Sequence, residues 1–266
     1  MPLYLFSMEL AFFLEIAINN WHLIILFFLV AALYASVGFG GGSSYLAILT
    51  LTGIAFTQIR STALLCNIMV VTGNVFLFQQ QKLYTWRKVV PLVLFSVPFA
   101  FIGGYVKISQ PFFFILLGFT LLFAALTMWI SKKIIASEKD TRTFSLTKNV
   151  SYGSVIGFIS GMVGIGGGIF LAPLLHVTHW DRPKKIAATA SFFILVNSIS
   201  GFIGQYANPN FEIDWTLTSI LLLTVFIGGH IGSRLSNKFF TAVQLKKTTA
   251  ILIAFVSVRI LWKHLF

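Results

Sequence analysis

Long apolar runs, separated by short clusters of charged residues, dominate the chain. Charge-free runs cover 16–59, 61–81, 89–106, 108–131, 149–180, 186–211, 215–233 and, more weakly, 248–258 continuing to the C-terminus. Because about 20 residues cross the apolar core of a bilayer as a helix, six of these runs predict one crossing each. The runs 16–59 and 149–180 are too long for one crossing, and each is interrupted by glycine.

The two glycine interruptions belong to an internal repeat. The segments 38–42 (GFGGG) and 164–168 (GIGGG) align at an offset of 126 residues. The match extends from Val37 with Val163 to 102–104 with 227–229, and its offset drifts only between 125 and 128. A match of this length indicates a duplicated structural unit. We expect a first repeat over 1–131, a linker over 132–148 and a second repeat over 149–266.

The basic residues indicate how the two repeats are oriented. If each glycine-broken run is a re-entrant hairpin, fifteen of the 19 Lys and Arg residues lie on one side of the membrane. If each run crosses once, the split is ten to nine, and a strong cytoplasmic excess is the rule. The sequence therefore predicts an all-α integral membrane protein of two inverted structural repeats. Each repeat has a Gly-broken re-entrant helical hairpin and three transmembrane helices, and only Arg60, Lys107, Arg259 and Lys263 are basic residues outside.

The composition excludes several classes of protein. The chain is 57% hydrophobic and 10% charged, with a mean hydropathy of +0.90, whereas soluble domains carry about 25% charged residues. The net charge of +12 lies in clusters between apolar runs, which indicates membrane sidedness rather than nucleic-acid binding. One cysteine, Cys66, excludes an intrachain disulfide and a thiolate-built metal site. Glu9 and Glu15, without a preceding basic stretch, argue against a cleaved signal peptide.

The chemistry expected at the glycine breaks is anion binding. Non-helical backbone at membrane depth survives only where protein or a wet cavity satisfies its polar groups. Half-helices beginning near Ser43 and Ile169 would direct their N-termini, with unpaired N–H groups and partial positive charge, at the protein centre. Ser43 and Ser44 either add hydroxyl donors or cap their helix. Their counterparts Ile169 and Phe170 are apolar, so the two half-sites cannot be identical.

A pure packing role for the glycines is the alternative. Gly153, Gly157 and Gly161 recur every four residues, a spacing typical of close helix contacts in membranes. Three consecutive glycines go further, because they weaken a continuous helix, and this favours a ligand-lining role at 38–42 and 164–168. A dinucleotide-binding loop is excluded, because no Asp or Glu follows either cluster at the required spacing.

The polar residues of the helices that follow the breaks extend the candidate site. These residues could instead form hydrogen bonds between helices, which are worth about 0.6 kcal/mol on average. For Ser and Thr this role is favoured over lining the site, and for Asn the two roles are equally supported. Catalytic residues, metal ligands and cofactors are not expected, because no Asp, Glu, Lys or Arg lies clearly within a predicted span. The expected substrate-binding residues are Gly40, Gly41, Gly42, Ser43, Ser44, Gly166, Gly167, Gly168, Ile169, Thr62, Asn67, Thr189, Ser191 and Asn197.

Several motifs of the second half point to one family. They are GIGGG at 164–168 followed by Pro173, ATASF at 188–192, IDW at 213–215, and GGHIG at 228–232 followed by Arg234. These motifs resemble the TauE/SafE family of sulfite-exporter-like permeases, and the resemblance covers nearly the whole chain. The first half matches more loosely, with Ala47 at the place of Pro173. The resemblance implies a multi-pass permease of the bacterial inner membrane for sulfite, organosulfonates or related small anions, with the glycine segments as substrate site.

The sequence thus predicts an anion transporter, and the partners expected are a small sulfite- or sulfonate-class anion and the lipid bilayer. An anion channel and a non-transporting membrane scaffold remain as alternatives. A membrane-embedded enzyme is not expected, because the spans lack clustered acid, base or metal-ligating residues. A homodimer is left open, and the native anion, the direction of flux and the coupling ion are not readable from the residues.

Overall fold

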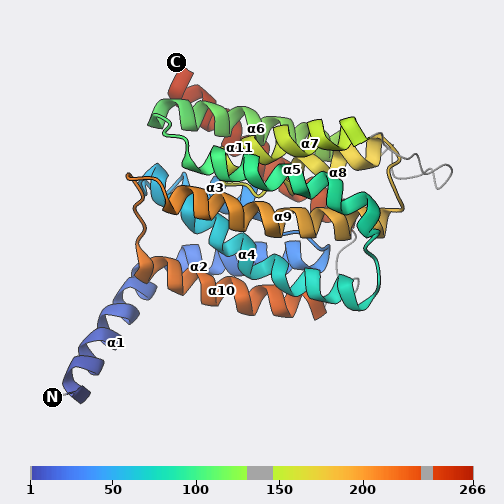
Figure 1. Ribbon diagram of the computed structural model, residues 1–266. Coiled ribbons are helices and arrows are strands. Elements are labelled where there is room, and N and C mark those ends of the chain that lie inside the picture. The colour runs from blue at the N-terminus through green and yellow to red at the C-terminus, as the bar shows by residue number, and fades with distance from the viewer. Residues whose placement is uncertain (1, 131–145, 235–241, 266) are drawn as a thin grey trace.

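The computed structural model describes residues 2–130, 146–234 and 242–265 (Figure 1). Within these ranges the chain forms eleven α-helices and no β-strand, which confirms the all-α prediction. The helices are α1 (Pro2–Asn19), α2 (Trp21–Ser36), α3 (Gly42–Leu49), α4 (Phe56–Gln80), α5 (Trp86–Tyr105), α6 (Gln110–Ile130), α7 (Leu146–Val163), α8 (Gly168–Val177), α9 (Pro183–Tyr206), α10 (Trp215–Arg234) and α11 (Ala242–Leu265).

Five of the described helices, α4, α5, α6, α9 and α10, are long and apolar enough to cross a membrane. A sixth span results if α1 and α2, which are bent by 75° relative to one another, are counted together. The multi-pass membrane protein is therefore confirmed. The last predicted run lies in α11, which packs along α6. Residues 132–145 of the predicted linker 132–148 lie outside the described residues. The inverted orientation of the repeats stays a prediction.

The chain reverses direction at both glycine breaks. Phe27 of α2 and Tyr45 of α3 stack with ring centroids 4.7 Å apart, although the break lies between them. A Cβ built on Gly41 would lie 2.9 Å from Val30 of α2, and one built on Gly167 would lie 3.2 Å from Ile156 of α7. These two contacts are equivalent at the repeat offset of 126 residues. Each break therefore joins a long helix to a short helix, α3 or α8, that folds back along it.

The two halves of the chain are interleaved rather than set side by side. In the first half, α5 packs most extensively on α7 and α9 of the second half, while α10 of the second half packs on α2 and α4. The pair α4 and α9 lies between them and runs antiparallel, because Ser61 near the start of α4 bonds Gln205 near the end of α9. Figure 1 shows the long helices lying roughly along one direction, with α1 extending away from the bundle.

Two opposite ends of the bundle carry different groups. At one end, Lys88 of α5 pairs with Asp181 of the α8–α9 loop at 3.1 Å. At the other end, Asn208 of the α9–α10 loop donates a hydrogen bond to the backbone oxygen of Tyr105 at 2.6 Å. We refer to these as the Lys88 end and the Arg60 end, since Arg60 near the start of α4 lies at the latter.

Arg60 lies within helix α4 and not in the loop before it. The helix α4 begins at Phe56, so Arg60 lies in its second turn, and the side chain is only 5% exposed. Charge-free runs end at every charged residue, even where the long arginine side chain is enclosed by neighbouring helices. The charge-free run 61–81 therefore begins after Arg60, whereas the helix itself begins before it, at Phe56.

Close packing of α5 on α7 depends on the glycines of α7. A Cβ on Gly153, Gly157 or Gly161 would overlap the backbone oxygen of Leu92, Ser96 or Ala100, respectively. The packing role predicted for this stripe is confirmed.

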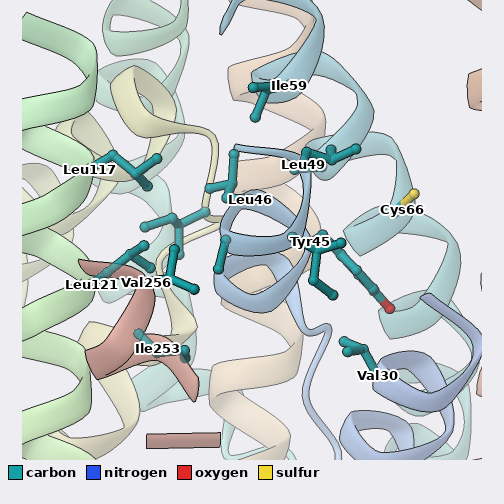
Figure 2. Close-up of a cluster of buried hydrophobic side chains, with 14 of the residues drawn as sticks. Val30, Tyr45, Leu46, Leu49, Ile59, Cys66, Leu117, Leu121, Ile253 and Val256 are labelled. Atoms are coloured by element: carbon teal, nitrogen blue, oxygen red, sulfur yellow. The ribbon is translucent and has the colours of Figure 1, made fainter. Parts of the chain in front are cut away.

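The short helix α3 is enclosed on all sides. Every residue from 42 to 49 is buried, and Figure 2 shows side chains of α2, α4, α6 and α11 gathered around Tyr45, Leu46 and Leu49. The helix α8 has an equivalent cluster formed with α5 and α9. Both short helices are thus held as parts of the core.

Gly161→Ala should lower the free energy of unfolding by about 1–3 kcal/mol, because the added methyl group forces α5 away from α7. Thermal unfolding in detergent micelles would measure this. Gly73→Ala is the matched control: Gly73 lies in helix α4 with nothing within 4 Å of its Cβ position, and alanine favours a helix by about 1 kcal/mol. Equal losses in both variants would contradict the packing argument.

Candidate functional site

The two glycine breaks meet each other between α4 and α9. Asn67 of α4 donates from Nδ2 to the backbone oxygen of Ile165 in the second break at 2.8 Å, and this bond is buried. A Cβ on Gly42 of the first break would lie 2.8 Å from the same Ile165 oxygen. Ser191 of α9 donates from Oγ to the backbone oxygen of Gly38. Side chains of α4 and α9 thus hold both breaks at one place, which we call the central site.

Left-handed glycine backbone starts each short helix. Gly41 precedes α3 with a φ of 86°, and Gly167 precedes α8 with a φ of 82°. L-residues with a side chain rarely adopt this conformation. The two positions are equivalent at the repeat offset of 126 residues. The helices begin at Gly42 and Gly168, one residue before the predicted starts near Ser43 and Ile169.

Each break presents a row of backbone amides that have no acceptor among the described residues. The amides of 40–43 and the equivalent amides of 166–169 make no hydrogen bond to backbone or side chains, whereas Ser44 and Phe170 return to helical bonding. All eight residues are buried. A helix leaves its first N–H groups unpaired and carries partial positive charge there. The central site therefore holds two sets of free donors on buried backbone.

Three buried side-chain oxygens add to this site. Asn67 Oδ1, Ser160 Oγ and Ser198 Oγ have no hydrogen-bond partner among the described residues. The Ser198 hydroxyl lies 2.6 Å from a Cβ position built on Gly166, and Ser160 Cβ lies 3.2 Å from one built on Gly167. A hydroxyl donates as well as accepts. Donors outnumber acceptors here, and the breaks themselves contain no Asp or Glu, so the arrangement suits an anion or ordered water.

In this conformation the glycines contact side chains directly. A Cβ on Gly40 or Gly42 would overlap Asn67, and one on Gly168 would overlap Ile194 of α9. Ile194 stands at the repeat position of Asn67, so the two half-sites differ in polarity as expected from Ser43 and Ile169. Close packing and unpaired amides therefore occur at the same glycines.

Three predicted site residues make contacts between helices. Thr62 Oγ1 lies 3.0 Å from Thr218 Oγ1 of α10, and Asn197 Nδ2 donates to Ser96 Oγ of α5 at 2.9 Å. Ser44 Oγ lies 2.9 Å from the Tyr34 hydroxyl of α2. The contacts of Thr62 and Asn197 are of the interhelical kind named as the alternative. Ser44, for which capping was the alternative, contacts α2, and α3 has no side-chain cap bond.

The remaining predicted residues are all buried. Ser43 and Ile169 are the last members of the two amide rows. The Ile169 side chain packs into the cluster around α3, while Thr189 is buried within α9. The binding roles of the predicted set stay predictions.

Sequence reasoning missed Arg60 and Ser160, and it left Ser198, one of the polar residues of the helix after the second break, out of the predicted set. A signal for the first was present: Arg60, Asn67 and Asn74 are spaced by seven residues, which is about two helical turns and one face of α4. All three are buried. Ser160 carried no comparable signal, because it lies within apolar sequence that is equally typical of helix packing, and for serines such as Ser198 hydrogen bonding between helices was the favoured role.

Comparison with known proteins decides the family. The family model described as sulfite exporter TauE/SafE matches residues 23–260. The chain belongs to the TauE/SafE family. A probable membrane transporter protein of Sinorhizobium fredii, y4hK, is 32% identical over 246 residues, covering 90% of this chain and 97% of the relative. A probable membrane transporter protein of Bacillus subtilis, YunE, is 25% identical and covers 87% and 94%, respectively.

A more distant relative lies outside bacteria. Sulfite exporter TauE/SafE family protein 3 of Arabidopsis thaliana is 26% identical over 119 residues, which is 42% of this chain and 25% of the relative. No solved structure matches the chain. The TauE/SafE assignment identifies the chain as a multi-pass membrane transporter of bacterial type and not an enzyme.

Asn67→Ala should lower the free energy of unfolding by about 1–3 kcal/mol, because the buried Ile165 oxygen loses its donor. Asn74→Ala is the control: Asn74 lies on the same face of α4, is equally buried, and its Nδ2 has no partner among the described residues. Thermal unfolding of both variants in one detergent compares them. A loss for Asn74→Ala as large as that for Asn67→Ala would refute the bridging role.

Proposed function

We propose that the chain is a carrier for small anions of the sulfite or sulfonate class, working by alternating access around the central site. The observation that carries the proposal is the pair of equivalent amide rows, 40–43 and 166–169, on buried backbone beside Asn67. Half-helix N-termini near the membrane midplane are a common way for transporters to bind the charged group of a substrate. The family description, sulfite exporter, supports the sulfur-oxyanion class.

The energetic argument rests on the amides. A buried polar group without a partner costs about 1–3 kcal/mol, so two such rows are costly unless an acceptor joins them. An oxyanion offers several acceptor oxygens, and it gains from the positive ends of α3 and α8. No acidic residue of the breaks opposes it. The same rows give no benefit to a cation.

Alternating access is supported by the relation between the halves. The contacts of Gly41 with Val30 and of Gly167 with Ile156 are equivalent at one repeat offset, and α4 and α9 run antiparallel. These features support two inverted repeats, over 1–131 and 149–266, that exchange conformations around the central site. An inverted arrangement lets one site open to either side with the same local structure.

The Lys88 end is closed by several contacts. Lys88 Nζ donates to Asp181 Oδ2 at 3.1 Å and to the Trp180 backbone oxygen at 3.0 Å. Tyr84, Trp86 and Phe192 form an aromatic trio with centroid distances of 5.0, 5.9 and 5.2 Å. Phe192 neighbours Ser191, which holds the first break. We take these contacts as the gate on the side that the basic residues assign to the cytoplasm.

Flux into proteoliposomes tests the proposal. Wild-type protein should move sulfite with saturable kinetics and with stimulation by sulfite on the opposite face. Gly42→Ala and Gly168→Ala should each reduce this flux about tenfold or more, because the methyl group displaces Asn67 or Ile194 and disturbs the amide rows. Gly73→Ala, with open space around its Cβ, is the control that keeps wild-type flux.

The outcomes separate the alternatives. Flux that does not saturate and shows no counterflow would indicate a channel. Wild-type flux in both glycine variants would refute the central site as the place of substrate binding but would still support transport. No flux of sulfite, sulfonates, chloride or lactate by folded wild-type protein would overturn the anion proposal.

Asp181→Asn should open the Lys88 end, because it removes the charge partner of Lys88. If the closed state loses about 1 kcal/mol of stability, the ratio of open to closed molecules rises about fivefold. The measurement is the maleimide labelling rate of a cysteine at position 191, because Ser191 is fully buried in this structure. Asp214→Asn is the control, since Asp214 only accepts backbone bonds from Thr216 and Leu217 at the opposite end. Equal rates in the two variants would argue against the gate.

A further inference from the structure

A cavity opens at the Arg60 end, away from the contacts of the Lys88 end. Its volume is about 50 Å³, and it lies between the start of α4, the end of α5 and the loop that follows α9. The residues that matter for its chemistry are Thr57, Arg60, Ser61, Lys107, Gln205 and Glu212. The family comparisons assign nothing to this cavity, and Arg60 was not among the predicted site residues.

The guanidinium of Arg60 is buried and poorly satisfied. Arg60 is 5% exposed, yet its hydrogen bonds are two contacts of 3.4 Å from Nη2 to the backbone oxygens of Gly104 and Gly161. Protein hydrogen bonds from N–H to oxygen usually measure 2.7–3.2 Å. The buried Nε has no partner among the described residues. Most of the donor capacity of this side chain is therefore unused.

No carboxylate among the described residues forms an ion pair with Arg60. Within the described residues the one ion pair is Lys88–Asp181, at the other end of the bundle. Two further charged residues line the cavity, Lys107 and Glu212, and both are exposed at its rim. Their charges offset each other, so the positive charge of Arg60 remains. A buried charge without a partner is costly, which points to an anion as the missing partner.

A purely structural role explains less of this arrangement. Arg60 does connect α5 and α7 through the two carbonyl oxygens, but a neutral amide donor would serve two long bonds at lower cost. Gln205 already bonds the same Gly161 oxygen at 3.4 Å. An arginine that lines a cavity and has an unpaired Nε is instead suited to oxyanions, which a guanidinium binds in a bidentate manner.

We propose that Arg60 and its cavity form a second, peripheral oxyanion site, at which a compact sulfite- or sulfonate-type group docks on its way to or from the central site. This inference rests on the proposed anion transport. Arg60 and Asn67 are seven residues apart on α4, about 10 Å along the helix. The backbone of Gly164, in the second break, lies against Arg60, with a Cβ position 3.1 Å from the Arg60 oxygen. The two sites are thus linked through α4 and the second break.

The size of the cavity limits the ligand. A cavity of about 50 Å³ has room for a few water molecules. A sulfite ion or the head of a short sulfonate fits this space, and a long organic tail would have to extend past Lys107 and Glu212 into the open. The site therefore selects for the charged group rather than for the rest of the molecule.

Protection of a cysteine from labelling tests the site directly. Thr57 lines the cavity, and Leu51 is exposed near the same end outside it. Purified Thr57→Cys and Leu51→Cys proteins are labelled with a charged maleimide. Each labelling rate is measured once in methanesulfonate and once in chloride, at equal ionic strength. Methanesulfonate should slow labelling at position 57 about fivefold or more and leave position 51 unchanged. Adding Arg60→Gln should abolish the protection, and Arg60→Lys should retain part of it.

The control for charge is Arg259→Gln, which removes the same charge from an exposed residue of α11 that does not line the cavity. It should leave the protection intact. In the flux assay, Arg60→Gln should raise the half-saturating sulfite concentration about tenfold or more, while Arg259→Gln keeps the wild-type value.

Failure of this site and failure of transport give different results. Saturable sulfite flux without protection of position 57, or with unchanged half-saturation in folded Arg60→Gln, would overturn the peripheral site and leave the transporter. Protection of position 57 that depends on Arg60, in a protein that moves no anion, would support the site and overturn the transport proposal. Equal protection by chloride would show a general salt effect and overturn oxyanion selectivity.

Discussion

In the apolar core of a bilayer, a backbone amide can bond only to protein, to an enclosed water or to a ligand. Most of this chain meets the constraint with continuous helices, in which every interior amide has its own acceptor. The segments 38–42 and 164–168 do not, and the surrounding structure follows from enclosing them. The helices α4 and α9 lie against both breaks, α3 is buried along its whole length, and the start of α8 is buried. Glycine makes this enclosure possible.

Glycine performs two tasks that are easily confused. In α7 it removes side chains so that the backbone of α5 can approach, and nothing about Gly153, Gly157 or Gly161 requires a ligand. In the breaks it also permits the left-handed turns at Gly41 and Gly167, which leave the following amides free. Close contact is common to both sets of glycines, whereas the rows of unpaired backbone amides among the described residues lie in the breaks and not at the α7 glycines. The difference lies in the backbone rather than in the residue type.

The spans and the breaks could be read from the sequence because both leave a local pattern. Charge-free runs of membrane length become α4, α5, α6, α9 and α10, and the duplicated glycine clusters become the two reversals.

Side-chain partners could not be read in this way. Thr62 and Asn197 lie in the expected helices but bond across to α10 and α5, because the face of each helix that meets the breaks depends on tertiary packing. Arg60 was lost for a different reason: segmentation by charge treats every arginine as the end of a span, although α4 continues through it.

The repeat positions of Arg60 and Asn67 are Ala187 and Ile194. A duplicated carrier with identical halves would have two end states of equal energy and equal affinity on both faces. Here one half supplies a cation and an amide where the other supplies a methyl group and a hydrocarbon branch. The differing residues of the two halves therefore make the two end states unequal in energy. The affinity for the same anion would then differ between the two faces of the membrane. A gradient would still set the direction of net movement, but scarce substrate would be collected better from the Arg60 end.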